Sequence, residues 1–263
     1  MREWKYYLCL SILGGSYVVL IVAMVVADFF FTTPGDLLAA LNDPAIRYSI
    51  NLTLISCTVT AILSLWVAVP MGYLLARTQF WGKTAVDTIL DIPIVLPPLV
   101  LGLSLLILFD YTTIGEWFRA NIMRISLRIP AVILAQFSVS AAFAVRTMRI
   151  TFEQTSPRTE QVALTLGCTR AQAFWRIVLP EARKGVLTAG TLAWARALGE
   201  FGPIMIFAGA TPNLTEVLST TVWLRFSDPD LPGAVAVALF MIAIGVFVLV
   251  LTRALGLRGT GLV

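Results

Sequence analysis

The amino-acid sequence predicts an all-α integral membrane protein with six transmembrane helices, on the basis of composition and hydrophobic patterning. Of its 263 residues, 58% are hydrophobic and 13% are charged, whereas soluble domains are about 45–50% apolar and about 25% charged. The apolar residues gather in six long runs, comparable with the roughly 20 residues that a helix needs to cross a bilayer. These runs are too long for barrel strands and do not alternate in polarity, so we expect helices.

The six predicted spans comprise residues 6–31, 49–76, 84–109, 130–145, 186–210 and 233–251. The first span is longer than a signal-peptide core and no small-residue cleavage site follows it, so we expect it to be retained. The third span contains Pro97, Pro98 and Gly102, which would kink it, either to form a pore gate or to pack locally. Residues 115–128 are predicted to form an amphipathic helix at the membrane interface.

The Lys and Arg residues predict which loops face the cytoplasm, because cytoplasmic loops are enriched in them. An even number of spans puts both termini on the same side of the membrane. If that side is cytoplasmic, it carries thirteen basic residues, namely Arg2, Lys5, Arg77, Lys83, Arg146, Arg149, Arg158, Arg170, Arg176, Arg183, Lys184, Arg253 and Arg258. The opposite side has five, namely Arg47, Arg119, Arg124, Arg128 and Arg225. We therefore expect cytoplasmic termini, and we interpret the net charge of +4 as an orientation signal and not as a nucleic-acid-binding surface.

Several kinds of chemistry are excluded or disfavoured by the composition. The chain has no histidine, which removes the usual general base and the commonest metal ligand and excludes Ser-His-Asp and Cys-His hydrolases. Cys9, Cys57 and Cys168 are far apart and odd in number, so we interpret them as small hydrophobic residues. The Gly-Lys-Thr of residues 82–84 lacks the first glycine and the preceding strand of a P-loop, so we expect no ATP site, metal site or other cofactor in this chain.

A polar segment of about 40 residues, 146–185, separates the fourth and fifth predicted spans, which is long for a simple connection. Residues 160–166 are helix-forming, and Gly167 is of the type that ends a helix. Thr169 can cap a second helix, which we expect to end before Pro180. The pattern predicts two short helices that meet at a glycine on the cytoplasmic face.

Residues in this segment follow a recognisable spacing, and the residues that match it are Ala163, Gly167, Ile177, Leu179 and Pro180. The spacing resembles the coupling loop of permease subunits of bacterial and archaeal ABC importers, which reads Glu-Ala-Ala, three residues, Gly, nine residues, Ile-x-Leu-Pro. Gln161 stands at the Glu position and Val162 at the first Ala, with Glu160 one residue earlier. The location also matches, because the segment lies between the penultimate two spans.

The resemblance implies a type I ABC importer permease fold and a non-catalytic subunit. The loop would be a coupling helix that docks on a separate ATPase subunit, which binds the ATP and Mg²⁺, and would pass the closure of the ATPase dimer to the spans. The residues assigned to this coupling are Glu160, Gln161, Ala163, Gly167, Ile177, Leu179 and Pro180. We expect Phe174 and Trp175, with Ile177 and Leu179, to anchor the loop against the spans. The implied partners are ATPase subunits, an extracytoplasmic substrate-binding protein and a second permease subunit, with a homodimer favoured.

Residues 94–102 (IVLPPLVLG) and 194–202 (WARALGEFG) are similar to permeases of the molybdate, tungstate and sulfate group. That likeness implies import of a tetrahedral oxyanion, molybdate first and tungstate or sulfate next. Arg196 and Glu200 lie four residues apart within an apolar span, where ionisable groups usually face the bundle interior or a water-filled path. They either line the translocation path, together with Pro97, Pro98 and Gly102, or form a structural ion pair that ties this span to a neighbour.

We expect residues 1–263 to form one permease domain, with its core over residues 49–255, in the inner or plasma membrane of a bacterium or archaeon. Membrane lipid is an expected partner and nucleic acid is not. Three alternatives stay open. One is a permease for an amino acid, polyamine or phosphate, and another is a secondary transporter or channel, for which the sequence offers no inverted repeat. The third is a membrane-embedded enzyme, which the missing histidine and the lack of a clustered nucleophile and base disfavour.

Overall fold

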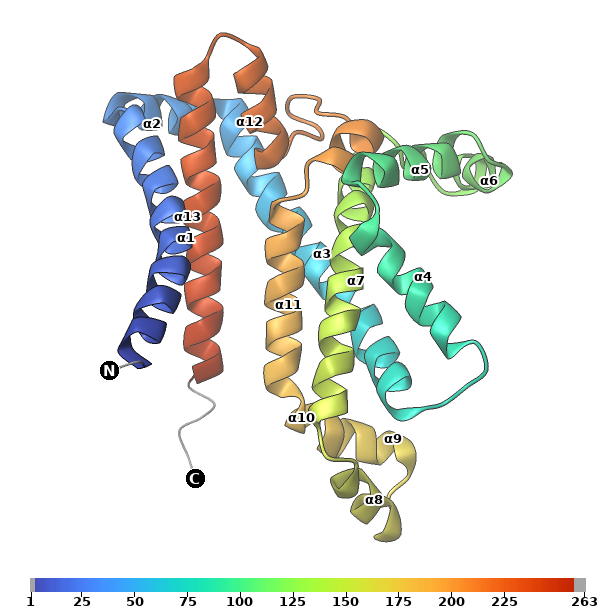
Figure 1. Ribbon diagram of the computed structural model, residues 1–263. Helices are drawn as coiled ribbons and strands as arrows, with labels where there is room; N and C mark the ends of the chain where they lie inside the picture. Colours follow the sequence, from blue (N-terminus) through green and yellow to red (C-terminus); the bar gives the residue numbers. More distant parts are fainter. Residues whose placement is uncertain (1–2, 258–263) are drawn as a thin grey trace.

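The computed structural model describes residues 3–257, which form helices joined by short connections (Figure 1). The elements are α1 (Glu3–Phe31), α2 (Pro34–Asn42), α3 (Pro44–Arg77), α4 (Lys83–Val95), α5 (Pro98–Asp110), α6 (Thr113–Asn121), α7 (Ile129–Gln154), α8 (Pro157–Thr165), α9 (Arg170–Ala173), η1 (Phe174–Val178), α10 (Leu179–Glu181), α11 (Arg183–Leu198), η2 (Ile204–Ala208), α12 (Leu218–Ser227) and α13 (Leu231–Leu257). Arg2 and Arg258, which count toward the predicted cytoplasmic side, lie outside the described residues. The predicted all-α class is confirmed.

Among the described residues, four helices are long and apolar enough to cross a membrane, namely α1, α3, α7 and α13. The helices α4 and α5, of 13 residues each, provide a fifth crossing only if the pair counts as one span, and they are bent by 112° at the break. The break falls at Leu96 and Pro97, whose ψ angles of 139° and 133° are extended, and a proline cannot donate the next helical hydrogen bond. The kink predicted in the third span is therefore a full break.

Two other predicted helices are shorter than expected. The prediction of one helix over residues 186–210 is wrong, because α11 ends at Leu198 and the backbone leaves helical geometry at Gly199 and Glu200 before η2. With 16 residues, α11 alone is shorter than the roughly 20 residues that span the hydrocarbon core. The predicted interfacial helix over residues 115–128 ends at Asn121, and the backbone at Leu127 adopts a φ of 60°.

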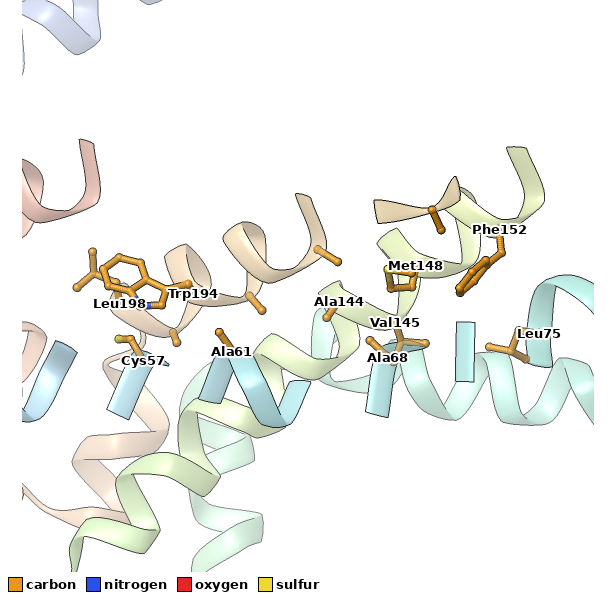
Figure 2. Packing of buried hydrophobic residues seen from close by; sticks show 14 of the residues in the cluster. Cys57, Ala61, Ala68, Leu75, Ala144, Val145, Met148, Phe152, Trp194 and Leu198 are labelled. Atoms are coloured by element: carbon orange, nitrogen blue, oxygen red, sulfur yellow. The ribbon is translucent and has the colours of Figure 1, made fainter. Parts of the chain in front are cut away.

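The helices α3, α7 and α11 form the central bundle, and small residues fill much of its core. Figure 2 shows Cys57 and Ala61 of α3 in the same buried cluster as Ala144 of α7 and Trp194 of α11. At Gly72 the two long helices approach so closely that a Cβ would lie 2.7 Å from the Cβ of Met148. Because helix association in lipid depends on van der Waals packing, such small residues allow tight contact. The burial of Cys57 agrees with its interpretation as a small hydrophobic residue.

The remaining helices surround this bundle. α13 packs against α11 and α12, and α1 lies along α13 at the periphery with its apolar surface exposed (Figure 1). At the end of the molecule that carries α2 and α12, Arg225 of α12 pairs with Asp43 and, at 3.1 Å, with Asp230. These pairs tie α12 to the beginnings of α3 and α13. The helices α8 and α9 lie at the opposite end of the bundle (Figure 1).

Candidate coupling hairpin and broken-helix junction

The two short helices α8 and α9 and the turn between them form a hairpin over residues 157–173, which we call the coupling hairpin. α8 ends in a Schellman motif, in which the Cys168 N–H donates to the Ala163 carbonyl at 3.0 Å and the Gly167 N–H donates to the Leu164 carbonyl at 3.1 Å. Gly167 has a φ of +90°, a conformation that L-residues other than glycine adopt only at a cost. The prediction that Gly167 ends the first helix is confirmed.

The second helix begins as predicted but does not end as predicted. Thr169 and Gln172 form a capping box, with the Gln172 side chain accepting from the Thr169 N–H at 2.9 Å. The expected end before Pro180 is wrong, because helical bonding continues through η1 and α10 to Glu181, and a turn at Ala182 then leads into α11. The Leu179 N–H donates to the carbonyl of Phe174, five residues back. This wider π-helical turn accommodates the proline, which has no N–H of its own.

The aromatic residue Phe174 anchors the hairpin to the bundle. Its ring centroid lies 4.8 Å from that of Tyr73 in α3. Ile177 and Leu179 are half-buried beside it. The expectation that Trp175 also anchors the hairpin is wrong, because this side chain is 65% exposed. The π-helical turn places Trp175 away from the bundle while Phe174 points into it.

The residues assigned to coupling divide into an outward and an inward set. Gln161 and Pro180 are exposed, whereas Ala163 is buried. The Glu160 side chain is only 13% exposed and turns toward α3. An open cleft of about 560 Å³ lies between the hairpin and α3, and its lining includes Gln161 and Arg170. Glu160 lines the same cleft. The two neighbours therefore differ in burial, because Glu160 is held against α3 whereas Gln161 is exposed.

The two broken spans pack against each other at a site that we call the broken-helix junction, residues 96–102 and 199–203. A Cβ on Gly102 would lie 2.7 Å from the Cα of Pro203. A Cβ on Gly202 would lie 3.1 Å from both the Leu99 nitrogen and the Cβ of Pro98. Only glycine permits backbones to approach this closely. The structure thus brings together two motifs that are separate in the sequence.

Side chains from neighbouring helices add hydrogen bonds to carbonyls at the end of α11, where the Ala197 carbonyl also accepts from the Glu200 N–H at 3.2 Å. The Gln136 side chain in α7 donates from Nε2 to the Ala197 carbonyl at 3.2 Å and accepts from the Thr60 hydroxyl at 3.2 Å. The Ser219 hydroxyl donates to the Glu200 carbonyl at 2.7 Å. Helix ends need such partners where water is excluded. Gln136 was not predicted from the sequence, although a lone amide inside the predicted fourth span was a signal for an interhelical hydrogen bond.

Arg196, near the end of α11, and Glu200, within the junction, form an ion pair of 3.1 Å. The ion pair therefore lies within one stretch of the chain, residues 196–200, and does not connect two membrane spans. The Arg196 guanidinium also lies 5.7 Å from the Phe143 ring centroid in α7, a cation–π distance. Glu200 is 1% exposed, whereas Arg196 is 31% exposed. The arginine is thus the accessible member of the pair.

The coupling hairpin and the junction lie at opposite ends of α11 (Figure 1). The hairpin enters α11 through α10 and Arg183, and the junction follows Leu198. A sequence profile of the family described as binding-protein-dependent transport system inner membrane component matches residues 68–258. The chain belongs to this family. The matched range includes both the hairpin and the junction, and it leaves α1, α2 and the first part of α3 outside.

Curated relatives resemble this permease over most of its length. A molybdate/tungstate transport system permease protein of Thermococcus kodakarensis is 32% identical over 255 residues, which cover 94% of this chain and 95% of the relative. A sulfate transport system permease protein of Escherichia coli is 32% identical over 210 residues, which cover 80% and 76%. A molybdenum transport system permease protein of Mycobacterium bovis is 32% identical over 212 residues, which cover 80% of each chain.

Solved structures share the fold. The permease matches a chain of a bacterial alginate ABC transporter, crystallised with an alginate-bound periplasmic protein, with a TM-score of 0.78, 15% identity, and coverage of 99% of this chain and 96% of that one. A chain of a methionine ABC transporter matches with a TM-score of 0.62, 15% identity and coverage of 83% and 99%. The predicted ABC permease architecture is confirmed, and the protein is an integral inner-membrane component of a transport system.

Proposed function

We propose that this permease forms the translocation path of an ATP-driven importer for a tetrahedral oxyanion, with molybdate first and tungstate or sulfate next. The observation that carries the proposal is the junction between residues 96–102 and 199–203, because its motifs are those that resemble oxyanion permeases and the structure packs them together. Relatives named as molybdate/tungstate, sulfate and molybdenum permeases support the same substrate class.

The partners follow from the coupling hairpin. Its exposed face, which includes Gln161, docks on an ATPase subunit that binds ATP and Mg²⁺, while this chain holds neither and catalyses nothing.

A substrate-binding protein delivers the oxyanion on the opposite side of the membrane. A second copy of the permease completes the path, both termini lie in the cytoplasm, and residues 1–263 act as one domain. Seven of the basic residues in the cytoplasmic set lie within residues 146–185, which favours that orientation.

The junction is suited to act as the gate. Its glycines allow two backbone breaks to meet without intervening side chains, so a small shift of either break opens or closes a passage. Arg196 provides a positive charge for a passing oxyanion, and Glu200 competes for the same guanidinium at 3.1 Å. Because an unpaired arginine would bind an oxyanion tightly, the internal carboxylate keeps that binding weak and release fast.

The test is ATP-dependent uptake in proteoliposomes. The permease is purified with its ATPase and supplied with its binding protein, and the uptake of labelled molybdate, tungstate and sulfate is compared. We expect uptake of oxyanions that stops when the ATPase carries an inactivating substitution. Uptake by the permease without an ATPase would instead indicate a secondary transporter or channel. Uptake of an amino acid, polyamine or phosphate in place of these oxyanions would overturn the substrate assignment.

A further inference from the structure

Glu160 sits one residue before the position that the coupling motif reserves for a carboxylate, and its side chain is largely buried against α3 in the cleft that the exposed Gln161 also lines. We infer that Glu160 is a positioning residue that locks the coupling hairpin to the end of α3 through Tyr73 and Arg77. The inference rests on the proposed function and deepens it, because it assigns the roles of holding the hairpin and of contacting the ATPase to different side chains.

The two carboxylate oxygens of Glu160 have different partners on the last two turns of α3. The Tyr73 hydroxyl donates to Oε1, and the Arg77 Nε lies 3.7 Å from Oε2. Arg77 also donates from its terminal nitrogen to the Thr155 carbonyl at 2.8 Å, where α7 gives way to the hairpin. Arg77 thus connects α3 both to Thr155, just before α8, and to Glu160 within α8. The hydrogen bond from Tyr73 to the carboxylate is charge-assisted and therefore stronger than a neutral one, whereas the Arg77 Nε contributes an ion pair without a hydrogen bond.

The Tyr73 ring is itself held in place, so its hydroxyl has a defined direction. The ring lies 5.6 Å from the Phe152 ring of α7 and 4.8 Å from the Phe174 ring of η1, both edge to face. These contacts bring α3, α7 and the hairpin to one point. Because aromatic pairs favour this geometry, the hydroxyl reaches Glu160 without losing much further conformational freedom.

Little else fixes α8 to the bundle. Ala163 is its one buried residue, and its small side chain removes little apolar surface from water. A second polar tie joins Thr159 to Glu181 at 3.2 Å, but both of these side chains are exposed. An exposed tie of this kind contributes little. The Glu160 lock is therefore the main polar connection between the first half of the hairpin and the membrane helices.

This arrangement has a mechanical consequence. With the lock in place, the hairpin and the end of α3 move as one body when the ATPase closes. Without it, α8 can tilt on its connections, so ATPase motion is absorbed before it reaches the spans. Loss of the lock should therefore reduce the number of oxyanions moved per ATP hydrolysed, while the binding of the ATPase through the exposed Gln161 face is retained.

Substitutions test the lock in the complete transporter. Tyr73→Phe removes only the hydroxyl, and Glu160→Gln keeps the shape of the side chain but removes its charge. We expect each to lower the oxyanion-to-ATP ratio roughly threefold to tenfold, with unchanged co-purification of the ATPase. Tyr48→Phe is the matched control, because it removes a hydroxyl from the other end of α3, where that group donates to the Leu214 carbonyl at 3.2 Å. Unchanged ratios in both lock variants would overturn the inference.

A cross-link separates positioning from a general effect on folding. Tyr73→Cys and Glu160→Cys are combined with Cys9→Ser and Cys168→Ser, while the buried Cys57 is kept. We expect a low oxyanion-to-ATP ratio before treatment and recovery after the two thiols are joined by a short bifunctional reagent. A ratio that stays low, or transport that stops once the thiols are joined, would show that the hairpin must move relative to α3 and would overturn the lock.

The same assay distinguishes this inference from the proposed function. If the wild-type transporter takes up no oxyanion in the presence of ATP and binding protein, the proposed function fails. If wild-type uptake is normal and the Tyr73 and Glu160 variants equal it, only the lock fails. If the variants lose the co-purifying ATPase, Glu160 belongs to the docking surface and the assignment of a positioning role is overturned.

Discussion

The coupling hairpin and the broken-helix junction are both departures from straight membrane helices, but they are built in different ways. The hairpin is determined by residues close together in the sequence, because a Schellman turn at Gly167 and a capping box at Thr169 shape it. The junction depends on residues about 100 positions apart, because Gly102 meets Pro203. An element shaped by residues close in the sequence and one shaped by long-range packing therefore lie at the two ends of α11.

The difference predicts how each region fails. In the hairpin, a substitution acts on backbone conformation or on one polar lock, since few of its side chains are buried. In the junction, a substitution acts on volume, since Ile204 and Phe207 next to it are fully buried with Val132 and Val217. Added volume in such a site displaces backbone and not only a side chain.

The largest effect is expected at the junction. Gly102→Ala places a Cβ 2.7 Å from the Pro203 Cα, a backbone atom that cannot turn aside. Overpacking of this kind costs about 1–3 kcal/mol, so we expect oxyanion uptake to fall by roughly tenfold or more, with the ATPase still bound. The control is Gly14→Ala in α1, where a Cβ meets nothing within 4 Å. Wild-type uptake by Gly102→Ala would mean that the close contact does not matter for transport.

A smaller effect is expected at the hairpin turn. Gly167→Ala meets no atom within 4 Å, so its cost comes from the φ of +90° alone, about 1–2 kcal/mol for an L-residue. We expect severalfold less ATPase to co-purify with this variant. Gly167→Asn should be milder, because asparagine adopts this conformation more readily. Equal losses for Ala and Asn would point to a side-chain contact with the ATPase in place of a backbone effect.

A moderate loss of stability is expected when the junction loses a polar tie. Gln136→Leu removes the donor to the Ala197 carbonyl while keeping a side chain of similar size. Because the Ala197 carbonyl still accepts from the Glu200 N–H, losing this one hydrogen bond costs about 0.5–1.5 kcal/mol, which should lower the midpoint of thermal unfolding in detergent by a few degrees. Ser138→Ala is the matched control on α7, since Ser138 bonds only its own helix, at 2.8 Å to Ala135. An unchanged midpoint for Gln136→Leu would contradict this role.

The smallest effect is expected at Glu216, which precedes Val217 beside the junction. Burial raises the pKa of the Glu216 carboxyl above its ordinary value of 4.5, against a weaker opposing hydrogen bond with Thr221. The folded protein therefore binds this proton more tightly, so its contribution to stability is present below pH 4.5 and is lost as the pH rises through the folded pKa. We expect Glu216→Gln to raise the unfolding midpoint slightly at pH 8 and to leave it unchanged at pH 4. A lower midpoint at pH 8 would contradict the sign.

The contrast between the two regions also explains what the sequence could predict. The turn at Gly167 and the cap at Thr169 follow local rules, so the sequence predicted both. The continuation of the helix past Pro180 was missed, because proline normally ends a helix and the compensating π-helical turn has no clear sequence signal. The helix end at Leu198 was missed because residues 186–210 form one mostly apolar run despite Arg196, Glu200 and Pro203, and hydropathy does not report hydrogen bonds supplied by Gln136 and Ser219.

The side-chain roles show the same limit. The sequence left open whether Arg196 and Glu200 line the translocation path or form a structural ion pair with a neighbouring span. Only the structure pairs them with each other and relates Arg196 to Phe143. The motif alone grouped Glu160 with Gln161, whereas the structure turns these neighbours in different directions. Which of two adjacent residues faces the bundle depends on how α8 sits against α3, and that follows from Tyr73, Phe152 and Phe174 meeting in space.

The helical bonding that continues past Pro180 to Glu181 has a consequence for leverage. Only a turn at Ala182 separates α10 from α11, and the hairpin lies at that end of α11 (Figure 1), so a sideways displacement of the hairpin becomes a tilt of α11. With 16 residues, α11 is about 24 Å long. If α11 pivots at the junction, a shift of about 4 Å at the hairpin corresponds to a tilt of about 10° there. The glycine contact is then the pivot of α11. The helix rotates there with the least linear displacement.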